Sequence, residues 1–231
     1  MASLKSTLIL STGIALSGLF IGLGFLTAKH PTQYVEVKGL AEETVKSNEA
    51  IWTLNIKLVN NDLNELYNNI SKAQQATRSF LIHQGFKENE LSMNSVSVTD
   101  NQSVTYNTNQ DIPRFSADTG ITVTSGNVNQ VANAIQNTGE LVQQGVVVTS
   151  SNAIYRFTQL NTIKPKMLEA ATQSARIAAE SFAKDSKTSL GQIHHASQGL
   201  FTITDANSSF DSGNSIFKKV RIVTTVEYQL K

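Results

Sequence analysis

The chain has no cysteine among its 231 residues, and it is poor in proline and histidine, with three and four copies. Without cysteine there is no disulfide framework, no thiolate site for zinc or an iron–sulfur cluster, and no cysteine nucleophile. Charged residues make up only 16% of the chain, and 19 lysines and arginines nearly balance 18 aspartates and glutamates. This balance excludes nucleic-acid binding through a basic surface, because such a surface needs an excess of positive charge.

Motifs of catalytic and metal-binding chemistry are missing as well. The histidines form no HxH or HExxH pattern, and the adjacent pair His194 and His195 would point to opposite faces of a strand. No serine lies in a GxSxG sequence, and no glycine-rich phosphate loop follows an expected strand. We therefore predict a non-enzymatic protein with no catalytic residues, no metal site and no cofactor.

The longest uncharged stretch lies near the amino terminus, between Lys5 and Lys29. As a helix at about 1.5 Å per residue, residues 6–28 would be roughly 34 Å long, enough to cross a hydrocarbon core of about 30 Å. We predict a short cytoplasmic terminus at residues 1–7 and a transmembrane anchor at residues 8–28. A cleaved secretory signal is the alternative, although the bulky Leu26 fits poorly at the −3 position of a cut after Ala28.

Beyond residue 33 the hydrophobic pattern changes between two periods. Apolar residues at every second position predict strands, including 52–58 and 219–230, and the valine run 146–148 is typical of a central strand. Helical spacing predicts a long helix from residue 63 to Gly85, a short one over 128–139, and a third over 165–183 with Pro165 in its first turn. The polar stretch 101–113 is expected to form a long hairpin tip.

This order predicts an α+β fold, a two-layer arrangement of antiparallel strands with three covering helices. The two halves have a similar order of elements, which leaves open two small subdomains (33–125 and 126–231) or one repeated unit. We assign Trp52 to the core because it lies on the buried parity of its strand.

Two groups of charged residues have structural explanations. The acidic residues near the first strands are interpreted as a solvated edge, and the basic residues that begin the last strand as edge charges that discourage aggregation. The acidic group is Glu42, Glu43 and Glu49, and the basic group is Lys218, Lys219 and Arg221.

Several short segments occur in a characteristic order: VEVKGLA at 35–41, AIWTL at 50–54, QGVV at 144–147, FAKDS at 182–186, QGLFTI at 198–203 and KKVRIVTTVEY at 218–228. Together they resemble the SIMPL domain (DUF541) of bacterial envelope proteins, over about residues 33–231. The resemblance implies an α+β fold in a periplasmic or membrane-anchored protein, and some relatives are thought to form ring-like or channel-like oligomers. The family has no accepted catalytic residues to carry over. Asn48 and Glu49 stand where many relatives have Pro-Asp.

We accordingly expect a SIMPL domain at residues 29–231, exposed to the periplasm and anchored in the inner membrane, or free in the periplasm if the first segment is cleaved. Its expected function is to self-assemble as a homo-oligomer or to bind envelope partners, with a role in stress response. A periplasmic module that binds a small ligand or a peptide in a cleft between subdomains is the alternative.

Overall fold

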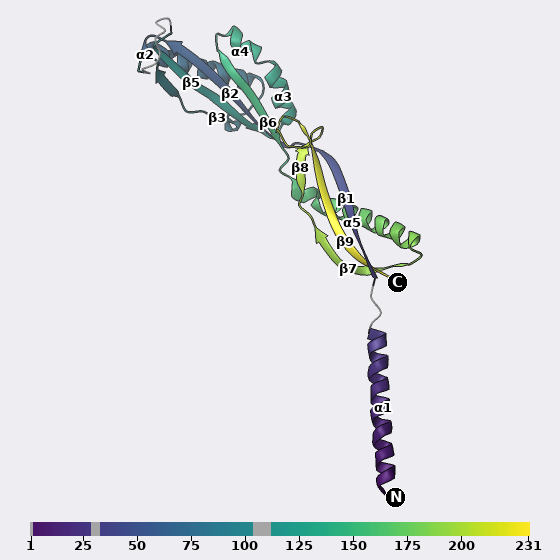
Figure 1. Ribbon diagram of the computed structural model, residues 1–231. Coiled ribbons are helices and arrows are strands. Elements are labelled where there is room, and N and C mark those ends of the chain that lie inside the picture. Colours follow the sequence, from purple (N-terminus) through teal and green to yellow (C-terminus); the bar gives the residue numbers. More distant parts are fainter. Residues whose placement is uncertain (1, 29–32, 104–111) are drawn as a thin grey trace. The chain divides into compact units, whose positions relative to one another are not determined.

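The computed structural model describes residues 2–28, 33–103 and 112–231 (Figure 1). The helices are α1 (Ala2–Ala28), α2 (Leu63–His83), α3 (Val128–Gln136), α4 (Gly139–Gln143) and α5 (Leu160–Asp185), with one 3₁₀ turn at Glu88–Glu90. The strands are β1 (Gln33–Lys46), β2 (Glu49–Asn60), β3 (Leu91–Met93), β4 (Ser97–Asp100), β5 (Phe115–Ser125), β6 (Val148–Arg156), β7 (Leu190–Gln198), β8 (Thr202–Asp205) and β9 (Phe217–Leu230). The predicted α+β class with antiparallel strands is confirmed. Most of the expected hairpin tip, residues 104–111, lies outside the described residues.

The chain forms two compact units, each assembled from separate segments. Unit 1 contains Met1–Gly39, Thr172–Gln198 and Thr224–Lys231, and unit 2 contains Leu40–Ala171 and Gly199–Val223. Three elements, β1, β9 and α5, are divided between the two units.

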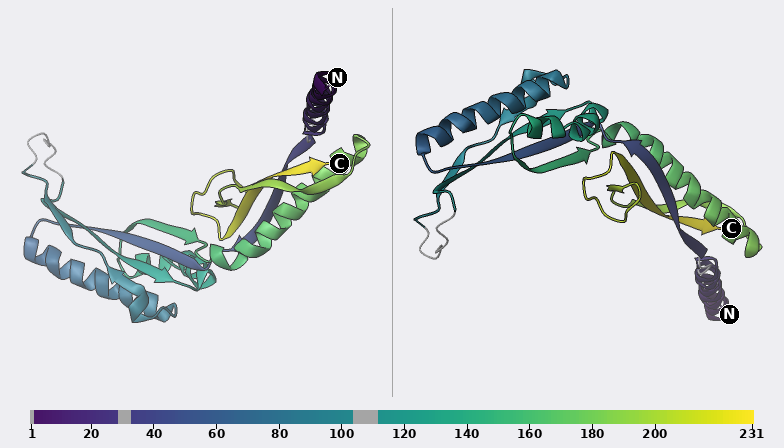
Figure 2. Two further views of the ribbon diagram at one scale, coloured as in Figure 1. Left: turned by 90° about the horizontal axis from the view of Figure 1, so that it is seen from below. Right: turned by 90° about the horizontal axis from the view of Figure 1, so that it is seen from above.

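Unit 2 holds a five-stranded sheet in the order β3-β5-β2-β6, with β4 also paired to β5. Alternate residues of β2, Trp52, Leu54 and Ile56, are fully buried. They pack in one cluster with residues of α2 and α3, so both helices cover the same face of the sheet (Figure 2). The indole of Trp52 is also satisfied, because its Nε1 donates to Ser151 Oγ at 2.9 Å. The core position predicted for Trp52 is confirmed.

The sequence forms helix α2 because it supplies an N-terminal cap and an amphipathic pattern. The Asp62 carboxylate accepts hydrogen bonds from the backbone N–H groups of Asn64 and Glu65 at 2.7 and 2.9 Å, which satisfies donors that no earlier turn can reach. The helix ends at His83, and Gly85 follows with a φ of 91°, a conformation that glycine adopts without strain. Of the apolar residues at helical spacing, Leu63 and Tyr67 are exposed. The buried residues form one stripe: Leu66, Ile70, Ala73, Thr77, Phe80 and Leu81.

Helix α5 packs through small side chains in both units. In unit 1, Ala175 and Ala179 lie against Val37, Val226 and Tyr228. In unit 2, Met167 and Ala171 lie against Val220 and Ile222 of β9. The predicted buried face of β9, from Val220 to Tyr228 at every second residue, is confirmed.

Helix α5 begins earlier than predicted, at Leu160, so Pro165 lies inside the helix instead of in its first turn. The missing N–H of the proline leaves the carbonyl of Asn161 without its usual helical partner. Leu160 and Ile163 pack against the Met167 cluster, and this burial favours the additional turn.

Two strand positions also differ from the prediction. The run 146–148 is not a central strand, because β6 begins only at Val148 and is the last strand in its sheet, with the Val147 side chain 61% exposed. The last strand, β9, is not an edge, because it lies between β1 and β7 in the four-stranded sheet. The interpretation of Lys218, Lys219 and Arg221 as edge charges is therefore wrong.

Helix α1 covers the predicted anchor segment. Over the described residues, no helix meets the combined length and hydropathy that crossing a membrane requires. The transmembrane span is therefore not confirmed.

Candidate functional site

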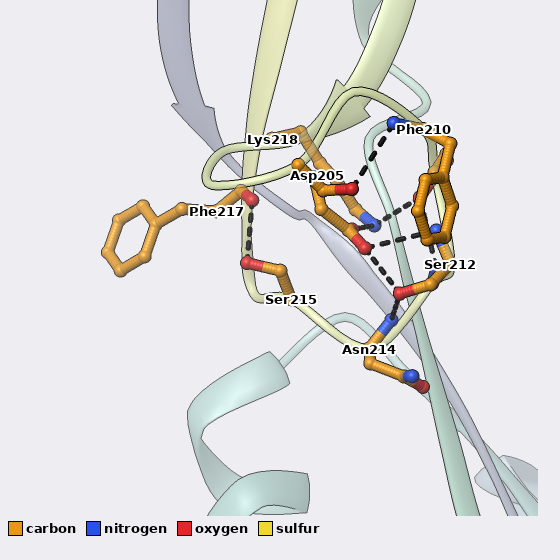
Figure 3. Close-up of polar contacts among 10 residues, drawn as sticks. Asp205, Phe210, Ser212, Asn214, Ser215, Phe217 and Lys218 are labelled. Atoms are coloured by element: carbon orange, nitrogen blue, oxygen red, sulfur yellow. Dashed lines mark hydrogen bonds and ion pairs between the residues drawn. The ribbon is translucent and has the colours of Figure 1, made fainter.

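A buried cluster of charges surrounds Lys218 at the start of β9 (Figure 3). The Lys218 side chain is fully buried, and its Nζ lies 2.6 Å from Asp205 Oδ1 and 2.6 Å from Asp211 Oδ1. Asp205 is itself buried, at 5% exposure, whereas the Asp211 side chain is 43% exposed. One ammonium thus meets two carboxylates, which come from the end of β8 and from the loop between β8 and β9.

The loop reaches Lys218 through its own hydrogen bonds. Asp205 Oδ2 accepts from the backbone N–H of Ser212 at 3.0 Å and from the Ser212 hydroxyl. Asp211 Oδ1 accepts from the N–H of Gly213 at 3.0 Å. Gly213 has a φ of 80°, and a Cβ there would lie 2.9 Å from Ile154 Cγ2, so the turn requires glycine.

The same loop joins β9 to the five-stranded sheet within unit 2. The N–H of Tyr155, on β6, donates to Gly213 O at 2.7 Å, and the N–H of Ser47 donates to Ile216 O at 2.8 Å. The side chain of Ile216 packs against the Trp52 cluster. The C-terminal part of the loop is therefore held by backbone hydrogen bonds in addition to the charged cluster.

Burial by itself would raise the pKa of Asp205, but the hydrogen bonds from Lys218 and Ser212 outweigh it and hold the pKa well below its usual range. Asp205 is thus a carboxylate at any physiological pH, and it neutralises a lysine that β9 places on a buried face. The Lys218 ammonium donates to both carboxylates, to Asp205 Oδ1 and to Asp211 Oδ1. The arrangement links β8, β9 and the loop between them within unit 2.

The histidines are dispersed. His194 Nδ1 lies 2.8 Å from Glu227 Oε2, and its ring is 4.4 Å from that of Tyr34, whereas His83 ends α2. His30 lies outside the described residues. Across residues 2–28, 33–103 and 112–231, no three metal-ligating side chains gather.

The acidic group of the first strands also separates into individual pairs. Glu42 lies 3.2 Å from Arg221 Nε, Glu43 lies 3.0 Å from Lys166 Nζ, and Glu49 lies 3.6 Å from Arg156 Nη1. Each glutamate thus faces its own cation, an arrangement that the sequence alone did not indicate because the partners lie far along the chain.

Three shallow pockets of unit 2 are lined by described residues. One of about 380 Å³ lies beside the end of β2, between α2 and residues 144–147. A second, of about 520 Å³, lies between α2 and β3. The third, of about 360 Å³, is lined by polar residues such as Asn55, Asn94 and Asp118. None of the three contains the Lys218 cluster.

Two comparisons with known proteins bear on the family. A search of curated proteins finds no match to the chain. The sequence model of one family, described as "SIMPL: Protein of unknown function (DUF541)", matches residues 35–221. This match covers most of the chain, with nearly all of unit 2 and part of unit 1, and the chain therefore belongs to the SIMPL (DUF541) family.

Proposed function

We propose that this chain is a non-enzymatic envelope protein that self-associates through the free edge of β7, with α1 holding the domain at a membrane on its periplasmic side. The observation that carries the proposal is the state of β7. It is the end strand of the order β1-β9-β7, and residues 192–198 are exposed along their whole length. An exposed strand edge is a template for pairing with another chain.

The direction of the backbone groups of β7 follows from one hydrogen bond. Just past the strand, the N–H of Gly199 donates to Val223 O at 2.9 Å, toward β9. Residues 195–198 continue in register with β9, so the N–H groups of Ser197 and His195 also point toward β9. The N–H and C=O of Ala196 therefore point outward, to the side where no described strand pairs.

Exposed apolar side chains near this strand favour another protein chain as its partner. The side chain of Ile193, on β7, is 51% exposed, and that of Leu200, just after the strand, is 89% exposed. Burial of such surface in a second copy would add hydrophobic free energy to the new backbone hydrogen bonds. Pairing of identical edges gives a symmetric contact.

Support for the membrane part of the proposal comes from α1. Residues 6–28 carry no charge, and the large apolar side chains described on this helix, such as Leu10, Leu19 and Phe20, are 50–70% exposed. Such a surface is unfavourable in water and favourable in lipid.

The mass of the full chain in a mild detergent, measured by size exclusion with light scattering at two concentrations, tests the self-association. We expect a protein mass about twice that of the 25.1 kDa monomer, because pairing of identical edges joins two copies. The variant Ala196→Pro should reduce this mass, because it removes an outward N–H while the pairs with β9 remain. A monomer at both concentrations would refute the proposal, as would an unchanged oligomer in the variant.

The matched control is Ser197→Pro. It removes an N–H that bonds β9 and should therefore lower the thermal midpoint of unfolding more than Ala196→Pro does. The comparison separates loss of an interface from loss of the strand.

A further inference from the structure

Strand β2 extends past the end of its neighbour β6. The last regular pair between them is Ile56 with Val148, and the N–H of Lys57 then donates to Val147 O at 3.1 Å. On its other side, β2 remains paired with β5 up to Asn60, without any shift in register. The end of β2 is thus a regular strand with one side uncovered.

The backbone of Val59 points to this uncovered side. In a regular strand, residues two apart direct their N–H and C=O groups to the same side. Since the N–H of Lys57 points toward Val147, the N–H and C=O of Val59 also point that way. No strand in the described part of the chain continues there. The position presents one hydrogen-bond donor and one acceptor to an incoming chain.

The pocket of about 380 Å³ lies at this edge. One wall is α2, which contributes the small side chains of Ala73 and Ala76, and the other is the turn at residues 144–147. Leu58 and Val146, both packed against the Trp52 cluster, make the floor apolar. The width left by the two alanines allows an apolar side chain to enter beside the strand.

The charge of the lining favours an anion. The described residues that line the pocket include Lys57 and Lys72 and no aspartate or glutamate. Lys57 Nζ lies 3.7 Å from Asp118 Oδ2, and the Lys57 side chain is 48% exposed. Because Asp118 already pairs with Lys57, Lys72, on α2, is the main cation available to a ligand. The amides of Asn69 and Gln144 add neutral hydrogen-bonding groups.

We propose that this groove binds the carboxyl-terminal end of an extended peptide. The peptide backbone pairs with Val59, an apolar side chain rests on Leu58 and Val146, and the terminal carboxylate lies near Lys72. A fatty acid would meet the cation and the apolar floor but would leave the C=O of Val59 facing hydrocarbon. A peptide satisfies both backbone groups, so it fits better. This site lies in unit 2, away from the β7 edge in the sequence, and it goes beyond self-association.

The probe is a library of fluorescent hexapeptides with a fixed apolar last residue, made with a free carboxylate or with a carboxamide at the end. Binding to the full chain is followed by fluorescence anisotropy. We expect the free acids to bind at least about tenfold more tightly than the amides, the factor expected for one charge-assisted hydrogen bond. The amide resonance of Val59 should shift on titration.

Two charge reversals complete the test. Lys72→Glu should weaken binding of the free acids about tenfold or more, whereas Lys46→Glu, an exposed lysine of β1 that does not line the pocket, should leave it within about twofold. Circular dichroism checks that both variants are folded. The absence of binding by any member of the library, equal binding of acids and amides, or equal effects of the two reversals would each overturn the proposal.

Discussion

At the scale of single residues, the least predictable feature is the burial of Lys218. It alternates with Val220 and Ile222 and therefore lies on the apolar face of β9. Burial of a charged lysine there costs free energy unless an opposite charge pairs with it. The two carboxylates that pair it belong to a loop rich in serine, asparagine and glycine, and nothing in the periodicity of β9 indicates that this loop turns back. Periodicity thus reveals which face is buried, but not which distant residue neutralises a charge on that face.

Removal of the Lys218 charge is expected to be severe. The variant Lys218→Met leaves the buried Asp205 carboxylate without its cation and should lower the free energy of unfolding by about 3–5 kcal/mol. The double variant Asp205→Asn, Lys218→Met removes both charges and should recover part of this loss. Urea unfolding followed by circular dichroism measures all three chains. A single variant as stable as the parent would show that the buried pair adds nothing.

The lowered pKa of Asp205 predicts acid sensitivity. Because the folded-state pKa lies below the unfolded value of about 3.9, the native state binds fewer protons in that range. Its contribution is therefore fully present above about pH 5 and is lost as the pH falls below about 4. The stability difference between the parent and Asp205→Asn should shrink on going from pH 7 to pH 2.5. A difference that stays constant over this range would contradict the assignment.

At the scale of elements, helix α2 and the parity of strands were predictable because they depend on local pattern. The single short helix expected over 128–139 is instead divided into α3 and α4, and Gly139 begins the second of them. Helix α2 carries its cap, its apolar stripe and its terminating glycine within one stretch of sequence. The order of strands was not predictable from the sequence. A valine run such as 146–148 has the same composition whether it lies in a central strand or at the start of an edge strand. Pro165 was misplaced for a similar reason, because packing of Leu160 and Ile163 extends the helix beyond what the proline suggests.

A pair of glycine substitutions tests how closely β2 and β5 approach. A Cβ at Gly120 would lie 2.1 Å from Leu54 O, so Gly120→Ala forces two central strands apart and should destabilise the fold by about 3 kcal/mol or more. At Gly139, the first residue of α4, a Cβ meets nothing within 4 Å, and Gly139→Ala should be neutral or stabilise by about 0.4–1 kcal/mol. Thermal unfolding of both variants measures the contrast, and similar midpoints would show that Gly120 is not required.

At the scale of the whole molecule, the two units are connected by continuous elements, since β1, β9 and α5 run from one into the other. The free edge of β7 belongs to unit 1, and the groove at the end of β2 belongs to unit 2. The proposals for self-association and for peptide binding therefore use separate parts of the chain. Substitutions at Ala196 and at Lys72 should act independently of each other.

The membrane proposal makes the last prediction at this scale. The full chain should float with phosphatidylcholine vesicles in a density gradient, because the exposed apolar side chains of α1 leave water on entering lipid. The double variant Leu16→Glu, Leu19→Glu places two charges in the middle of this helix, each costing about 2.5–3.5 kcal/mol at the centre of a bilayer, and should abolish flotation. Leu63→Glu, at an equally exposed leucine of α2, is the matched control and should float like the parent. If the parent stays at the bottom of the gradient, or if the double variant floats, α1 does not hold this protein at a membrane, and the periplasmic placement loses its main physical support.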